Sequence, residues 1–352
     1  MPWLNDMLSQ TPVKAALERC DSWDMDPFLL DRATNGRPLV VGAMYLLQRI
    51  GVTDKLNVPG DKLANFLAAV ERRYRPTNPF HNALHATDTV FTTHYFLQRP
   101  LLRGMLGPLD KLAAIIAAAV HDYGHPGLNN AFLVASRHEN AILYNDQSIL
   151  EMYHIAGAWR TLLTEPGCNF AEGFSRDQYR QLREAMVSMV LATDLKYHFE
   201  HLGRLKMRLM SDAFVTVDRK DVLFLLGQVV HAADISNCTK PPNLQFQWTK
   251  RVMTEFFMQG DLEASIGLPI SAMMNRETTL VPQVQMGFIK ALVMPLYVEI
   301  RKLLGEECQI CVDTLKGTLT GWETDGAALC EDWDLSHPGG ALAFDYVHPV
   351  MH

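Results

Sequence analysis

Histidine and aspartate residues of this chain gather in short groups, and most of these groups lie in or beside apolar segments. In the first group His81 and His85 are four residues apart, a spacing that places side chains on one face of a helix. Alone, these two residues fit an ordinary histidine pair as well as half of a metal site. Because imidazole and carboxylate groups bind divalent cations, the other groups decide between these interpretations.

Two aspartates follow apolar segments that are expected to be buried. The stretch "AAIIAAAVHDYGHPG" contains His121 and Asp122, with His125 a turn later, and "VLFLLGQVVHAADISN" contains His231 and Asp234. A buried carboxylate is costly unless its charge is compensated, and an aspartate is disfavoured at the C-terminal end of a helix. Since metal coordination compensates the charge, we interpret Asp122 and Asp234 as metal ligands.

Four residues on three separate segments form the predicted site for divalent cations: His85, His121, Asp122 and Asp234. Zinc accepts such a mixture of ligands, whereas magnesium or manganese prefers carboxylate and water. One aspartate can bridge two cations, and two neighbouring cations hold a hydroxide for in-line attack on phosphorus. The residues therefore predict a metal-dependent hydrolase. A fourth polar stretch, "VLATDLKYH" with Thr193, fits an ordinary helix end equally well.

The elements that must position these residues are predicted to be helices. Apolar residues recur at intervals of three and four, whereas strand alternation is absent, which predicts a compact all-α fold of many helices forming one domain over residues 1–352. The segments with this periodicity are 61–74, 108–120, 180–191, 219–233 and 246–257. Asn78 and Pro79 are expected to begin a helix that contains His81 and His85. Residues 305–352, rich in glycine and proline, are expected to form irregular structure or a short last helix.

Composition excludes several classes of protein. A formal net charge of -7 argues against a general nucleic-acid binder. The six cysteines suit reduced thiols, and the CxxC of Cys308 and Cys311 has no second pair to complete a zinc site. The sequence has no uninterrupted apolar run of about 18 residues, so it predicts no membrane span. The first residues do not have the pattern of a signal peptide. We expect a soluble protein of the cytoplasm.

Three stretches resemble the motifs of a known family. They are "FHNALHATD" at 80–88, "HDYGHPGLNN" at 121–130 and "HAADISNCTKP" at 231–241. Their order is similar to that of class I cyclic nucleotide phosphodiesterase catalytic domains, within the HD metal-dependent phosphohydrolases. Further similar stretches are "GRPL" at 36–39, "YNDQSILE" at 144–151, "EFFMQGDLE" at 255–263 and "QMGFI" at 285–289. The resemblance extends from about residue 23 to residue 304 and implies an all-α domain with a deep metal-containing pocket.

The resemblance also implies chemistry. The four predicted ligands would hold zinc, with Asp122 bridging to magnesium or manganese. A bridging hydroxide would hydrolyse cAMP, and also cGMP, to the 5′-nucleoside monophosphate. His81 would act as the general acid that protonates the leaving O3′ oxygen. The residues implied to surround and orient this centre are His125, Glu151, His154 and Thr193.

The resemblance places the purine base in a second part of the site. Gln285 would form hydrogen bonds with the base, and Phe288 with Val252 would contact its two faces. Asn237 stands where adenine-preferring members often have asparagine. Because the Gln285 amide offers a donor and an acceptor in either orientation, adenine and guanine both fit unless neighbouring residues fix the amide.

Other interpretations stay open at this point. Another HD phosphohydrolase would share the metal ligands without needing Gln285, Phe288 or His81, and a cyclic-nucleotide-binding module would lack a ligand or His81. Cys238, Asn275 and Lys290 depart from the family pattern near the base pocket. Regulatory domains outside this chain are also expected, because many members of the family have them. The second metal and the oligomeric state are not fixed by the sequence.

Overall fold

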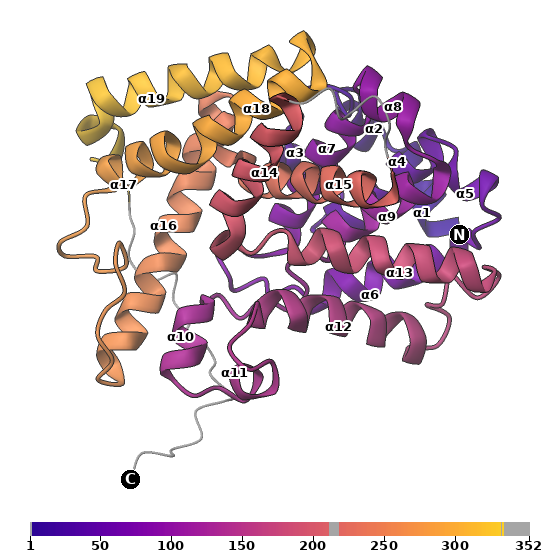
Figure 1. Ribbon diagram of the computed structural model, residues 1–352, viewed down its shortest axis with the longest axis horizontal. Coiled ribbons are helices and arrows are strands. Elements are labelled where there is room, and N and C mark those ends of the chain that lie inside the picture. Colours follow the sequence, from indigo (N-terminus) through magenta and orange to yellow (C-terminus); the bar gives the residue numbers. More distant parts are fainter. Residues whose placement is uncertain (1, 211–217, 332, 334–352) are drawn as a thin grey trace.

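The computed structural model describes residues 2–210, 218–331 and 333, and within these residues every regular element is a helix (Figure 1). The predicted all-α fold is confirmed. The single domain over residues 1–352 stays a prediction. None of the described helices combines the length with the apolar composition that crossing a bilayer requires.

The first part of the chain forms α1 Pro2–Ser9, α2 Thr11–Leu17, α3 Pro27–Ala33, α4 Pro38–Arg49, α5 Val52–Lys55, α6 Gly60–Arg73, α7 Ala83–Leu97, α8 Pro100–Met105 and α9 Pro108–Val120. The middle part forms α10 Asn130–Ala135, α11 Glu139–Leu143, α12 Ile149–Thr164, α13 Arg176–Leu191, the 3-10 helix η1 Leu195–Tyr197 and α14 His198–Met210.

The last part forms α15 Arg219–Asp234, the 3-10 helix η3 Ser236–Thr239, α16 Pro242–Ser265, α17 Val281–Phe288, the π-helix η4 Ile289–Val293, α18 Met294–Leu304, the 3-10 helix η5 Glu306–Cys308 and α19 Gln309–Cys330. All five segments with helical periodicity therefore lie in helices. Proline stands in the first turn of several of them, where its missing N–H has no partner to lose.

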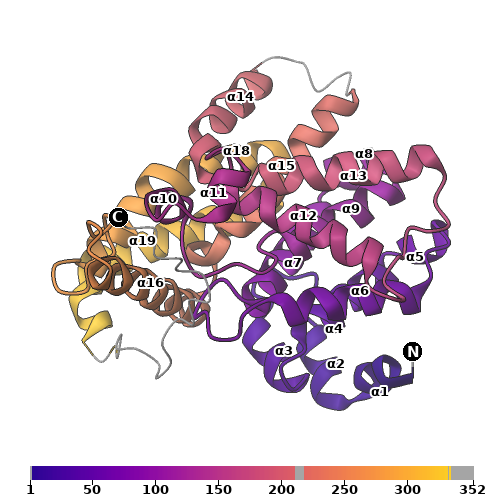
Figure 2. The same ribbon diagram turned by 90° about the horizontal axis from the view of Figure 1, so that it is seen from below.

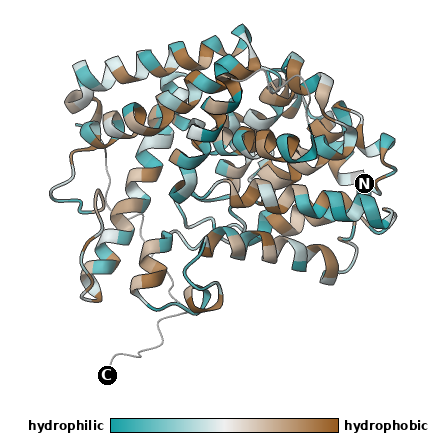
Figure 3. Cartoon of the chain, viewed as in Figure 1, coloured by the Kyte–Doolittle hydropathy of each residue, from teal (hydrophilic) through white to brown (hydrophobic). Residues whose placement is uncertain are grey.

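Helix α9 lies in the middle of the fold, where it packs against α4, α7 and α13 (Figure 2). Every residue from Leu112 to Val120 is 0% exposed. The alanines of this helix let its neighbours approach closely, and the apolar residues exclude water. Figure 3 shows polar and apolar residues alternating along the outer helices, such as α19. The site residues that follow α9 are thus attached to a buried helix of the core.

The helix around the first histidine pair begins later than predicted. Helix α7 begins at Ala83, and Asn82 caps it by accepting hydrogen bonds from the backbone N–H groups of Leu84 and His85. His81 therefore lies in the preceding turn, and the prediction that it shares a helix with His85 is wrong. The extended backbone of Asn82 separates the two residues, and the backbone N–H groups of Phe80 and His81 donate to a carboxylate of α16.

The glycine-containing stretch "GTLTGWETDG" is helical, which was one of the two expectations for it, but it lies within a helix of 22 residues, α19, rather than a short one. Buried residues of α19 recur at helical spacing, among them Leu315, Thr318, Trp322 and Gly326. A side chain at Gly326 would meet Pro282, since a Cβ atom there would lie 2.7 Å from the Cβ atom of Pro282. Close packing on α17 thus favours glycine despite its low helix propensity. The later stretch "LSHPGGALAFDYVHPV" lies outside the described residues.

Candidate active site

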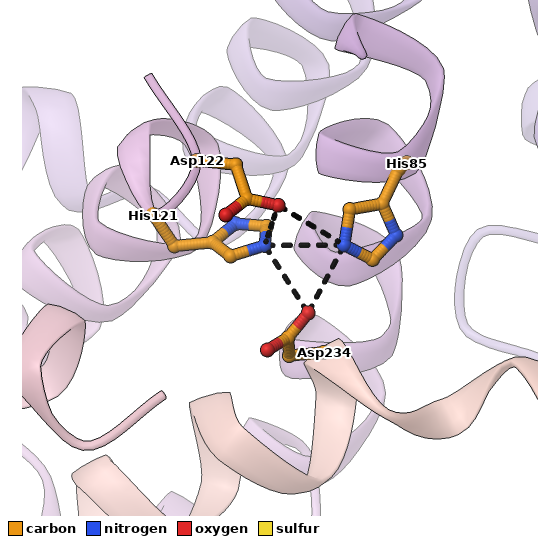
Figure 4. A group of neighbouring side chains, drawn as sticks. All are labelled: His85, His121, Asp122 and Asp234. Carbon is orange, nitrogen blue, oxygen red and sulfur yellow. Dashed lines mark hydrogen bonds and ion pairs between the residues drawn. The ribbon is translucent and has the colours of Figure 1, made fainter. Parts of the chain in front are cut away.

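Four side chains from three parts of the chain converge on one point (Figure 4). They are His85 of α7, His121 and Asp122 at the end of α9, and Asp234 at the end of α15. His85 Nε2 lies 3.0 Å from Asp234 Oδ1 and 3.2 Å from His121 Nε2. Asp122 Oδ2 lies 3.1 Å from His121 Nε2. One donor atom from each of the four residues faces the same centre, all within 4.8 Å of one another.

Hydrogen bonds to the backbone help to orient this group. His121 Nδ1 donates to the carbonyl oxygen of Ala118 at 2.8 Å, because a carbonyl can only accept. This bond leaves the lone pair of Nε2 free to bind a cation, as in many metal-bound histidines. The end of α9 at Val120 turns His121 and Asp122 into the site. Asp234 is the last residue of α15, so its carboxylate extends beyond the helix.

The charges of this group fit a bound cation. Burial alone raises the pKa of the Asp122 and Asp234 carboxyl groups, but without a metal the positive charge of a protonated His121 outweighs burial and holds both pKa values well below the usual range. A bound cation would supply the positive charge in its place and leave His121 neutral. Asp122 Oδ2 is buried and faces the Nε2 atoms of His121 and His85 at 3.1 and 3.5 Å. Two buried carboxylates with two imidazoles form an N and O donor set that suits zinc. The four residues are therefore able to hold a divalent metal.

A second unit next to this group is built on His81. The His81 Nδ1 atom forms a short contact with Glu255 Oε1, and Glu255 Oε2 accepts hydrogen bonds from the backbone N–H groups of Phe80 at 2.8 Å and His81 at 3.0 Å. Glu255 is 3% exposed on α16. With Nδ1 bound to Glu255, Nε2 is the nitrogen that remains available to give or take a proton.

Electrostatics keep His81 protonated. Burial lowers the pKa of His81, but the negative charges of Glu255 first, and then of Asp122 and Asp234, outweigh burial and raise the pKa to about 9. The ring of His125 stacks on His81 with 4.0 Å between ring centroids and 17° between the planes. His81, His125 and Glu255 each have a ligand atom within 4.8 Å of the other two, but the Glu255 carboxylate already occupies His81 Nδ1. His81 is thus arranged to hold a proton.

Glu255 is the residue of this site that sequence reasoning missed. The stretch "EFFMQGDLE" was noted only for its resemblance to the family, without a role for its first residue. The available signal was a glutamate among apolar residues of a predicted helix, with Val252 and Met258 three residues away on either side and Phe256 and Phe257 directly after it, which predicts a buried carboxylate that needs a partner. The sequence does not identify that partner, because His81 lies 174 residues earlier in the chain.

Of the four residues predicted to surround the metal centre, His154 and His125 lie next to Asp122. His154 Nε2 is 3.7 Å from Asp122 Oδ1, and its Nδ1 donates to the Tyr123 carbonyl oxygen at 2.7 Å. Burial lowers the pKa of His154 to about 4, which favours its neutral form. His125 also belongs to the Asp122 group, since its ring nitrogen lies within 4.8 Å of the ligand atoms of Asp122 and His154.

The other two predicted neighbours make local contacts. Asn130 Nδ2 donates to Glu151 at 3.1 Å, and burial with the negative charge of Asp194 raises the pKa of Glu151 to about 7. The Thr193 hydroxyl donates to the Val190 carbonyl oxygen at 2.8 Å. His231, three residues before Asp234, instead contacts His198 Nδ1 through its Nε2 at 2.9 Å.

The predicted base-binding residues lie on neighbouring elements. Gln285 of α17 is 4% exposed, and its Oε1 accepts a hydrogen bond from the Thr249 hydroxyl of α16 at 3.4 Å. Val252 is one turn after Thr249, and Phe288 ends α17 one turn after Gln285, so this bond joins the two helix turns. Asn237 is buried in η3. The contact of Val252 and Phe288 with a base stays a prediction.

Comparison with known proteins identifies the family. The family model for 3′5′-cyclic nucleotide phosphodiesterase matches residues 80–315. The chain is 39% identical to the mouse dual specificity calcium/calmodulin-dependent 3′,5′-cyclic nucleotide phosphodiesterase 1B over 288 residues, which are 82% of this chain and 53% of the mouse protein.

Two proteins of Caenorhabditis elegans are similarly close. The chain is 39% identical to the probable 3′,5′-cyclic phosphodiesterase pde-1, over 80% of this chain and 42% of that protein. It is 36% identical to the probable 3′,5′-cyclic-AMP phosphodiesterase pde-4, over 85% of this chain and 45% of that protein. The chain thus spans about half the length of these relatives. With the metal-ligand group, these matches show that the chain belongs to the 3′,5′-cyclic nucleotide phosphodiesterase family.

Proposed function

We propose that this chain hydrolyses 3′,5′-cyclic nucleotides, with cAMP and also cGMP as substrates, to 5′-nucleoside monophosphates. The observation that carries the proposal is the pairing of a protonated His81, held by Glu255, with a group of four metal ligands beside it. Phosphodiester hydrolysis needs an activated water, neutralised phosphate charge and a protonated leaving group. The site offers residues for each of these needs.

The proposed cofactors are zinc and magnesium or manganese. His85, His121, Asp122 and Asp234 would hold zinc, and the second oxygen of Asp122 would reach the second cation. When bound, these ions supply an activated water and charge neutralisation at the phosphate. The position of Asp122 supports this assignment, because its carboxylate faces the same point as the His85 and His121 nitrogens and the Asp234 carboxylate.

His81 is the proposed proton donor. As water attacks phosphorus and the bond from phosphorus to O3′ breaks, His81 Nε2 would give its proton to O3′. Glu255, bound to Nδ1, stabilises the protonated ring before transfer and fixes its orientation. His125, stacked on the ring, limits its rotation.

The residues around the centre have proposed supporting roles. His154 would orient Asp122, since its Nδ1 is already held by a backbone carbonyl. Glu151, buried next to Asn130, would accept a hydrogen bond from water in the site. Thr193 would shape the wall at the end of α13 rather than bind a ligand directly, because its hydroxyl is bonded to Val190.

A hydrogen-bond relay behind Gln285 supports acceptance of both purines. Gln245 Nε2 donates to Thr249 Oγ1 at 2.8 Å, and this hydroxyl donates to Gln285 Oε1. Because a hydroxyl both donates and accepts, reversing the two amides gives an equally satisfied relay running from Gln285 to Gln245. Gln285 would then present either order of donor and acceptor to a base held by Val252 and Phe288. Asn237 is the residue proposed to favour adenine.

Hydrolysis assays test the proposal. Purified protein is assayed with cAMP, cGMP and a non-cyclic phosphate diester, before and after metal chelation. We expect turnover of both cyclic nucleotides, loss of activity with the chelator, and recovery when zinc and magnesium are returned. Turnover of the non-cyclic ester alone would indicate a different phosphohydrolase, and cyclic nucleotide binding without turnover would indicate a binding module. Either result would refute the proposed function.

A further inference from the structure

One face of α16 is buried although it carries polar side chains. Gln259 and Glu263, one helical turn apart, are each 2% exposed. Gln259 Nε2 donates to Glu263 Oε1 at 2.8 Å and to Asn129 Oδ1 at 3.1 Å. Gln259 Oε1 accepts a hydrogen bond from the Asn129 backbone N–H at 2.9 Å. None of these three residues has a part in the proposed reaction, so their buried hydrogen bonds need another explanation.

Glu263 binds the segment that follows α16. Its Oε2 accepts a hydrogen bond from the Ser271 backbone N–H at 2.6 Å, and its Oε1 accepts one from the Ser271 hydroxyl at 2.7 Å. With the bond from Gln259, one buried carboxylate thus receives three hydrogen bonds. Bonds of this kind to a carboxylate are stronger than those between neutral groups, so Ser271 is held firmly.

Two neighbouring positions of α16 hold the same segment. A Cβ atom at Gly260 would lie 1.9 Å from the Met274 carbonyl oxygen, so the backbone of the segment lies directly on the helix at this glycine. Asp261 accepts hydrogen bonds from Arg276 Nε at 2.9 and 3.1 Å. Residues 260–263 therefore form a docking strip for residues 271–276.

The docked segment leads to the predicted base pocket. It connects α16, which ends at Ser265, to α17, which begins at Val281 and contains Gln285 and Phe288. Figure 1 shows this connection returning beside α16 toward α17. Only four residues separate Arg276 from α17. Fixing the segment on α16 therefore restricts where the first turn of α17 can lie.

We propose that Glu263 is a positioning residue for the nucleotide base: by holding Ser271 on α16, it sets the place of α17 and so of Gln285 and Phe288. This inference rests on the proposed function. Glu263 acts on binding of the base rather than on bond breaking, because the metal ligands lie on α7, α9 and α15, and Glu255 lies two turns away on the same rigid helix.

Kinetics of Glu263→Gln test the inference. The substitution keeps the size of the side chain but replaces one acceptor oxygen with a donor group, so it loses at least one bond to Ser271 or Gln259. We expect KM for cAMP to rise about tenfold, with kcat within about twofold of the wild type and unchanged bound zinc. Glu277→Gln is the matched control, because Glu277 is exposed in the same connection, and its KM is expected to equal that of the wild type.

A second variant keeps the test decisive if Glu263→Gln does not fold. Ser271→Ala removes only the hydroxyl bond from a partly exposed residue, and a smaller rise in KM is expected. An unchanged KM in Ser271→Ala and in folded Glu263→Gln would overturn the inference, as would a loss of zinc and kcat in place of a rise in KM. A wild type that hydrolyses no cyclic nucleotide would refute the proposed function and the inference with it. An active wild type with unchanged KM in the variants overturns the inference alone.

Discussion

The buried ion pair of Lys240 and Asp88 can be used to test what holds together the helices that carry the proposed metal ligands. Lys240 Nζ lies 3.1 Å from Asp88 Oδ1 and donates to the Thr92 hydroxyl at 2.7 Å. The ammonium group also lies 4.7 Å from the centre of the Trp23 ring. Lys240 and Asp88 are 2% and 3% exposed. The pair joins α7, which carries His85, to the segment that follows Asp234.

Lys240→Met removes the ammonium group and keeps most of the length of the side chain. The Asp88 carboxylate is then buried without a cation, and we expect the free energy of unfolding to fall by about 3 to 5 kcal/mol. Asp88→Asn leaves the ammonium group without its anion and should cost a similar amount. The double variant has neither charge, so its stability should lie much closer to that of the wild type.

Urea unfolding of the wild type, the two single variants and the double variant measures the coupling. Lys316→Met is the matched control, because Lys316 and Asp313 are 62% and 61% exposed at a separation of 3.9 Å, and such surface pairs contribute at most about 1 kcal/mol. The reasoning is refuted if Lys240→Met costs no more than Lys316→Met. It is equally refuted if the losses of the two single variants simply add in the double variant.

Three further predictions concern the proton donor, the packing behind the metal site and the metal itself. Glu255→Gln removes the largest of the negative charges that raise the pKa of His81 to about 9 against the effect of burial. Since a proton donor loses activity as pH rises through its pKa, the alkaline limb of the kcat profile should move to lower pH. An alkaline limb that does not move would contradict the proposed role of His81. Gly157→Ala should lower the free energy of unfolding by about 1 to 3 kcal/mol in urea, because its Cβ atom would lie 2.4 Å from the Tyr123 ring, whereas Gly203→Ala, with open space around it, should be neutral or stabilising; equal effects would exclude the clash. Removing metal with a chelator should lower Tm, and zinc at about 1,000 times its Kd should restore about 4 kcal/mol of stability. A Tm that does not respond to zinc would contradict the proposed metal site.

The grouping of His85, His121, Asp122 and Asp234 could be predicted because the two aspartates leave local signals in the sequence. Asp122 and Asp234 follow apolar segments, and a charged residue at the end of a buried helix needs a compensating partner. The helices could also be predicted from the sequence, because the spacing of apolar residues along a helix is local information.

The residues that sequence reasoning missed depend on contacts between distant segments. Glu255 lies in a helix without any local sign that His81 is its partner, and no residue near Asp88 in the sequence identifies Lys240 as its partner. The start of α7 was misplaced because Asn78 and Asn82 are both local capping candidates, and only the extended backbone of Asn82 in the structure shows which of them begins the helix. Helix α19 continues through its glycines because Gly326 packs on Pro282, which local propensity does not reveal.

Paired measurement of bound zinc and cAMP turnover in the wild type and in His81→Ala tests the central claim most directly. The claim is that His81 donates the proton while His85, His121, Asp122 and Asp234 hold the metal. It predicts a wild type that binds zinc and hydrolyses cAMP, and a His81→Ala variant that keeps its zinc while kcat falls by about 100-fold or more. Full turnover by His81→Ala, or loss of zinc together with activity, would contradict the claim.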